Sequence, residues 1–89
     1  MFKVLIIDDE RAIRNTLAEI LQDEGYKVEV AENGEEGLEK FKKCPFDVVL
    51  CDIKMPKMDG IEFLEKSREI NPDVPLIMIS GHGTIETAV

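Results

Sequence analysis

Three aspartates follow apolar segments of this sequence, and together their side chains could bind a cation. Asp8 and Asp9 come directly after the apolar run Val4 to Ile7, and Asp52 comes after a second apolar run. If these runs are neighbouring parallel strands, the three carboxylates meet at the edge of the sheet where ligands bind. Carboxylates that close repel one another unless a cation lies between them, and oxygen ligands without His or Cys favour Mg²⁺.

The same residues could accept a phosphoryl group. A metal beside them would neutralise the incoming charge while a free carboxylate oxygen acts as nucleophile. Asp52 is the candidate nucleophile because it stands alone, opposite the pair, and the hydroxyl of Ser80 could donate to a phosphoryl oxygen. A plainer interpretation stays open for each: residues 8–10 could be only the acidic start of a helix, and Ser80 an ordinary turn hydroxyl.

The apolar pattern predicts strands and helices in strict alternation. Continuous apolar runs indicate strands that are covered on both faces, whereas the alternating pattern of residues 27–31 indicates an edge strand. The predicted strands are residues 4–7, 27–31, 47–51 and 75–79, and the predicted helices are residues 10–24, 33–43 and 61–70. The fold class is therefore α/β, a doubly wound parallel sheet with helices on both faces.

The end of the sequence departs from this pattern. Thr84 is a good N-cap and predicts a last helix, of which barely one turn is present before Val89. The apolar strand at 75–79 would then form an open sheet edge, which native proteins avoid. We therefore expect residues 1–89 to be one domain that is truncated at its C-terminus.

Composition excludes several function classes. The 89 residues contain 11 Lys+Arg and 19 Asp+Glu, so the net charge is −8 and the isoelectric point about 4.6. Such an acidic chain is a poor ligand for nucleic acid, and it contains no apolar run near the ~20 residues of a membrane span. The N-terminus does not resemble a signal peptide, so we expect a cytoplasmic protein in which Cys44 and Cys51 are reduced thiols.

Three segments resemble the receiver domains of bacterial two-component response regulators. They are residues 6–10, 48–60 and 77–83, in the order and spacing of that family, and the stretch from Asp52 to Gly60 is the most specific. The closing residues 80–89 are most similar to receivers of sigma-54-dependent transcriptional activators. The resemblance implies a regulatory phosphoprotein switch rather than a conventional enzyme, with at most autophosphatase activity.

The resemblance also implies roles for individual residues. Asp52 matches the aspartate that takes a phosphoryl group from the phosphohistidine of a sensor histidine kinase. Asp9 and Asp52 match direct Mg²⁺ ligands, Asp8 matches a ligand that acts mostly through water, and the main-chain carbonyl of Lys54 matches the remaining protein ligand. Ser80 matches the switch hydroxyl. Pro56 and Gly60, which lie outside the ligand set, match residues that shape the loop after Asp52.

The family has strand order 2-1-3-4-5, and its fifth strand begins with a lysine that pairs with the phosphoryl group. This sequence has no match to that lysine, so we expect order 2-1-3-4 with the fifth strand and helix missing. The alternative function is a self-associating module without phosphorylation, a homodimer that pairs strands or swaps elements through the truncated edge. An aspartate phosphatase would need Asp-x-Asp on one strand, a pattern that neither Asp8 nor Asp52 begins.

Overall fold

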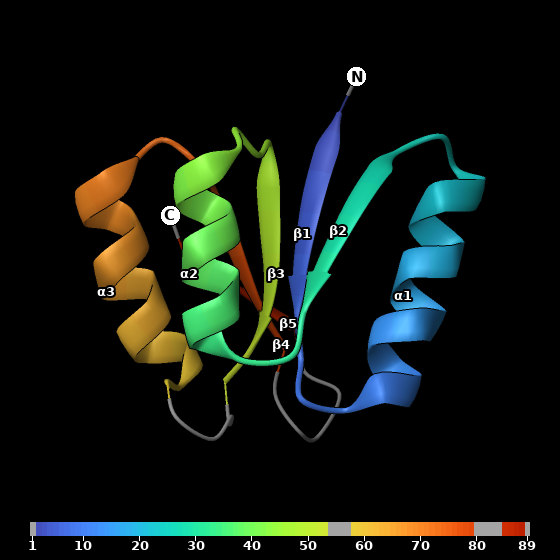
Figure 1. The fold of residues 1–89 in the computed structure, drawn as a ribbon, viewed down its shortest axis with the longest axis horizontal. Helices are drawn as coiled ribbons and strands as arrows, with labels where there is room; N and C mark the ends of the chain where they lie inside the picture. The colour runs from blue at the N-terminus through green and yellow to red at the C-terminus, as the bar shows by residue number, and fades with distance from the viewer. Residues whose placement is uncertain (1, 54–57, 80–84, 89) are drawn as a thin grey trace.

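A five-stranded sheet organises the chain. The structure is a computed structural model that describes residues 2–53, 58–79 and 85–88. The elements in chain order are β1 (Lys3–Ile7), α1 (Arg11–Asp23), β2 (Lys27–Ala31), α2 (Gly34–Lys43), β3 (Val48–Asp52), α3 (Gly60–Ile70), β4 (Leu76–Ile79) and β5 (Ile85–Ala88). The strand order is β2-β1-β3-β4-β5, and β1 to β4 pair in parallel (Figure 1). This arrangement confirms the predicted α/β fold with strand order 2-1-3-4.

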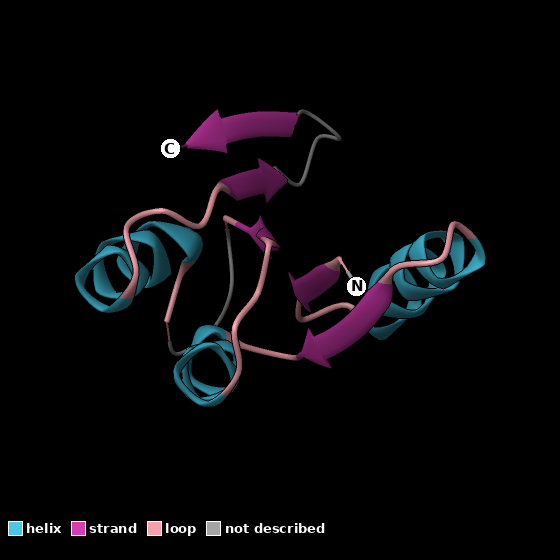
Figure 2. Cartoon of the chain, turned by 90° about the horizontal axis from the view of Figure 1, so that it is seen from above, coloured by secondary structure: helices cyan, strands magenta, loops and turns pink. Residues whose placement is uncertain are grey.

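The helices form two layers around the sheet. Seen from above, α1 covers one face and α2 and α3 cover the other (Figure 2). The core beneath α2 and α3 is centred on Phe63, which is fully buried and meets the ring of Phe41 edge to face at 6.1 Å between centroids. From β1, Leu5 and Ile7 belong to this core. The continuous apolar run of β1 is therefore buried between the helices on the two faces of the sheet.

The face under α1 is covered less completely than the sequence predicts. The apolar spacing of α1 is helical, yet Ile13 and Ile20 are 38% and 54% exposed and α1 has no buried residue. The helix packs on β1 and β2. An apolar groove of about 470 Å³ lies beside it, and half-buried side chains of β3 and β4, such as Leu50 and Ile77, line its floor.

Local signals place the helix ends close to the predicted positions. The Asn33 side chain accepts a hydrogen bond from the Glu36 N–H at 2.9 Å, and the Glu36 carboxylate accepts one from the Glu32 N–H at 2.7 Å. These two bonds form a capping box at the start of α2, with the return bond one residue before the cap. Gly25 ends the segment after α1 with φ of 93°, a left-handed conformation that glycine adopts without steric cost. No helix among the described residues has the length and apolar character needed to cross a bilayer.

The prediction for the end of the chain is wrong. Residues 85–88 form an antiparallel strand on β4, with Ile85 opposite Ile79 and Ala88 opposite Leu76, where the sequence predicts a helix and no fifth strand. Thr84, the predicted cap, lies outside the described residues. A helix of barely one turn costs more to nucleate than it gains, whereas β4 offers an open row of N–H and C=O groups. β5 occupies that row, so the edge of β4 is paired within this chain.

Candidate metal site at the carboxyl edge of the sheet

The structure brings the three predicted aspartates together. One carboxylate oxygen from each of Asp8, Asp9 and Asp52 lies within 4.8 Å of the others. The register explains this proximity, because Ile7 pairs with Cys51, and the next residue of each strand is an aspartate. Asp52, predicted to follow its strand, is the last residue of β3. The ends of two adjacent parallel strands therefore create the cluster.

Asp8 is held firmly at the buried side of the cluster. Only 2% of its surface is exposed. Its main-chain N–H donates to the Ala31 carbonyl at 3.1 Å, and its carboxylate accepts from the Glu10 N–H at 2.9 Å. Burial raises the pKa of this carboxyl and the negative charges of Asp9 and Glu10 raise it further, against lowering effects of the Glu10 N–H and the Arg14 guanidinium. Negative charge is thus costly here until a cation compensates it.

The residues that contact Asp52 on either side are buried and closely packed. Cys51, directly before it, has no exposed surface, and burial together with the nearby carboxylates raises the pKa of its thiol to about 12. On the other side, Gly60 approaches so closely that a Cβ there would lie 2.6 Å from the Asp52 carbonyl oxygen. The Gly60 N–H donates to the Ile53 carbonyl at 2.9 Å. These contacts agree with the predicted role of Gly60 in shaping the loop after Asp52.

The donor set suits a hard divalent cation. Direct ligands of Mg²⁺ lie about 2.0–2.1 Å from the metal, so that two of them are at most roughly 4.2 Å apart. The carboxylate oxygens of the cluster approach this limit, and small side-chain movements would close them on one ion. All three ligands are oxygens, which Mg²⁺ prefers over nitrogen or sulfur.

Several predicted residues cannot be placed. Lys54, Pro56 and Ser80 lie outside the described residues, so their proposed roles stay predictions. Met58, which follows Lys54 and Pro56 in the chain, is buried in the core cluster. Sequence reasoning missed Arg14, whose Nη1 donates to the Asp8 carbonyl at 2.8 Å. No sequence pattern indicates this contact, because it depends on the rotamer of a long side chain.

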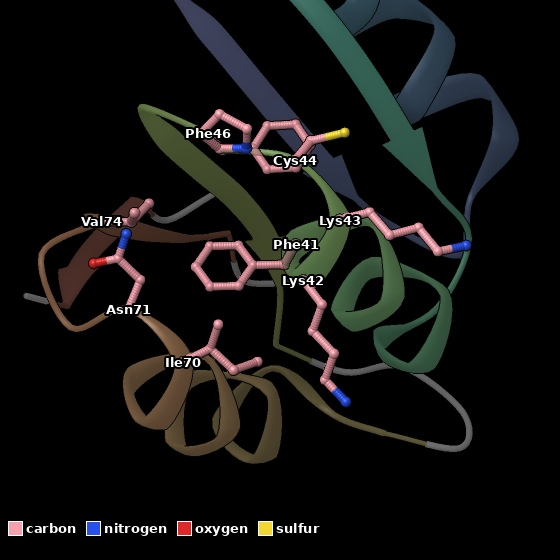
Figure 3. A pocket seen from close by; sticks show the side chains of 9 residues that line it. Phe41, Lys42, Lys43, Cys44, Phe46, Ile70, Asn71 and Val74 are labelled. Atoms are coloured by element: carbon pink, nitrogen blue, oxygen red, sulfur yellow. The ribbon is translucent and has the colours of Figure 1, made fainter.

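A second hollow does not compete with this site. It lies at the opposite end of the sheet, where α2 and α3 end, and has a volume of about 250 Å³ (Figure 3). Phe41, Lys42, Ile70 and Asn71 are among its lining residues, none of which is a carboxylate. Of these two places, only the carboxyl edge offers a set of metal ligands.

Comparison with known sequences identifies relatives across the chain. ZraR of Klebsiella oxytoca, a transcriptional regulatory protein, is 40% identical over 86 residues, which are 97% of this chain and 19% of ZraR. An NtrX-like response regulator of Rickettsia bellii is 46% identical over 91 residues, covering 100% of this chain and 19% of that protein. The chain therefore spans about one fifth of the length of these relatives.

Solved structures have the same fold. A CheY-like receiver domain protein of Methanospirillum hungatei has a TM-score of 0.90 and 40% identity, over 94% of this chain and 67% of that one. TrrA of Thermotoga maritima, solved in complex with Mg²⁺ and BeF, has a TM-score of 0.86 and 42% identity, over 92% of this chain and 73% of that one. Residues 4–89 match the profile of the response regulator receiver domain. The match covers nearly the whole chain, and the chain therefore belongs to this receiver domain family.

Proposed function

We propose that Asp52 accepts a phosphoryl group from the phosphohistidine of a sensor histidine kinase in an Mg²⁺-dependent reaction. The observation that carries this proposal is the meeting of three carboxylates at the ends of β1 and β3. A structural role alone gives no reason for three negative charges within 4.8 Å, one of them buried. A neighbour of the same fold that was solved with Mg²⁺ and BeF supports the choice of metal.

The chemistry assigns different tasks to the carboxylates. An Asp52 oxygen attacks phosphorus, the bond from phosphorus to the kinase imidazole nitrogen breaks, and the electron pair leaves with the imidazole. Asp9 and Asp52 would hold Mg²⁺ directly and Asp8 through water, together with the Lys54 carbonyl. The bound metal supplies compensation of the negative charge that gathers in the transition state. Ser80 would then donate its hydroxyl to the phosphoryl group as the switch residue.

The output that we propose is regulatory. Phosphorylation of Asp52 changes the surface near Ser80 and thereby controls an attached or partner function such as transcription activation. ZraR, whose name is that of a transcriptional regulatory protein, supports this direction. The net charge of −8 argues against direct contact of this domain with nucleic acid.

The test is the intact mass of the chain before and after incubation with Mg²⁺ and acetyl phosphate. We expect a gain of one phosphoryl group that disappears when Mg²⁺ is chelated and in the Asp52→Asn variant. Asp73→Asn is the matched control, because Asp73 is an exposed carboxylate outside the cluster and its loss should leave the gain unchanged. Labelling of Asp52→Asn equal to the parent, or no labelling of the folded parent, would refute the assignment.

A further inference from the structure

The loop between β1 and α1 supplies two of the three carboxylates, and few contacts fix its course. The main-chain N–H of Asp8 ties the loop to β2 through the Ala31 carbonyl. The bond from the Glu10 N–H to the Asp8 carboxylate closes a tight turn around Asp9, which is itself exposed. Both contacts constrain this turn, but neither is made by the carbonyl oxygen of the peptide group that joins Asp8 to Asp9.

Arg14 makes a contact with that carbonyl oxygen. It lies in the first turn of α1, where its main-chain N–H donates to the Glu10 carbonyl at 3.0 Å. From there its Nη1 reaches back and donates to the Asp8 carbonyl oxygen at 2.8 Å. A peptide group is planar, so a fixed Asp8 carbonyl oxygen also fixes the plane that contains the nitrogen and Cα of Asp9. The position of the Asp9 Cα, from which the side chain extends toward the cluster, is thereby restricted.

We propose that Arg14 is a positioning residue for the cation site, which holds the peptide between Asp8 and Asp9 so that both carboxylates face Asp52. The inference rests on the proposed function and deepens it, since it names the residue outside the ligand set that the site requires. Groups that orient metal ligands commonly change metal affinity about 10- to 100-fold when they are removed.

The charge of Arg14 acts in the opposite direction. A guanidinium near the cluster repels a divalent cation, so its removal would tighten Mg²⁺ binding if charge were its only effect. Positioning predicts the reverse, a weaker affinity without Arg14. The sign of the change therefore separates the two roles, and a residue that contributed only to stability would leave the affinity of the folded protein unchanged.

The experiment is a calorimetric titration with Mg²⁺ alone on the parent and three variants, under conditions where circular dichroism shows each to be folded. For Arg14→Met we expect about tenfold weaker binding. Arg14→Lys keeps the charge and one donor without the guanidinium fork, and we expect about threefold weaker binding. Arg11→Met is the control, because it removes the same charge from the same helix turn. Arg11 is exposed, and its side chain makes no hydrogen bond or ion pair with the described residues.

The outcomes distinguish this inference from the proposed function. If the parent binds Mg²⁺ and Arg14→Met binds it equally or more tightly, Arg14 does not position the site, although the site stands. If Arg14→Met does not fold, Arg14→Lys decides: weaker binding than the parent supports the inference, and equal binding refutes it. If the folded parent binds no Mg²⁺ and is not labelled, the proposed function fails and the inference fails with it. A loss in Arg11→Met as large as in Arg14→Met would also overturn the positioning role.

Discussion

Replacement of Gly60 by alanine tests how tightly the backbone holds the candidate phosphoacceptor. Gly60 is the first residue of α3, and a Cβ there would lie 2.6 Å from the Asp52 carbonyl oxygen and 3.0 Å from the Cα of Ile53. Real Cβ contacts are essentially never shorter than 3.0 Å, so the new methyl group forces a shift of at least 0.4 Å (3.0 − 2.6), and 0.8 Å (3.4 − 2.6) restores ordinary contact. Both neighbours are backbone atoms and cannot rotate away.

Two opposing effects determine the stability of Gly60→Ala, and the displacement of Asp52 determines its rate of phosphorylation. Overpacking of this kind costs about 1–3 kcal/mol, while replacement of a helical glycine by alanine regains about 0.5–1 kcal/mol. We expect a net loss of about 1–2 kcal/mol in the free energy of unfolding. Because Asp52 itself must shift, and misplacement by 1 Å can cost about 100-fold, we expect phosphorylation to slow about tenfold.

Gly25→Ala is the matched control. The φ of Gly25 is 93°, and no atom lies within 4 Å of a Cβ placed there, so alanine strains the backbone without touching the site. Left-handed backbone costs a residue with a Cβ roughly 1–2 kcal/mol, similar to the loss expected for Gly60→Ala. Urea unfolding followed by circular dichroism measures both losses, and the initial rate of mass gain with acetyl phosphate measures labelling. Only Gly60→Ala should be slow to label, and a parental rate in Gly60→Ala would refute the reasoning.

Three further predictions concern the thiols, the metal and the core. In the native protein at pH 8, iodoacetamide should modify half-buried Cys44 before Cys51, because a pKa of about 12 leaves Cys51 with almost no thiolate. Mass spectrometry of the peptides measures the two rates of modification, and equal rates would contradict the prediction. Burial raises the pKa of Asp8, so its ionisation opposes folding, and without metal the stability that its neutral form provides is lost as pH rises through that pKa. Mg²⁺ at ten times its Kd should restore about 1.4 kcal/mol at pH 7.5 and less below that pKa, as thermal unfolding at both pH values will show. Phe63→Ala should cost about 3–5 kcal/mol in urea unfolding because the ring is fully buried, whereas the exposed Ile70→Ala should cost less than about 1 kcal/mol.

Strand positions and the carboxylate cluster could be predicted because they depend on local patterns. Four apolar segments are separated by helix-like spacing, and parallel strands place their carboxyl ends on one edge whatever their order. The apolar pattern alone does not predict that β1 and β3 are neighbours, which is what brings Asp52 to Asp8 and Asp9. The family resemblance implies this adjacency. The structure now shows it as a register in which Ile7 pairs with Cys51.

Other features depend on contacts that no local pattern contains. Residues 85–88 are too few to have a decisive preference, and the open edge of β4 determined that they form a strand. Ile13 and Ile20 have the spacing of a buried face, but α1 packs mainly on β1 and β2 near one edge of the sheet, and both side chains are exposed. The bond from Arg14 to the Asp8 carbonyl depends on one rotamer of a long side chain, which sequence spacing does not specify.

The close approach of Gly34 to Met58 restricts how Met58 can move. A Cβ at Gly34 would lie 2.6 Å from the Met58 carbonyl oxygen, so the first residue of α2 and the Met58 backbone are already in contact. Any displacement of Met58 toward α2 is blocked by main-chain atoms, which do not yield as side chains do. The Met58 backbone can therefore move only away from α2. A displacement that begins at Asp52 and reaches Met58 is thus limited to that direction.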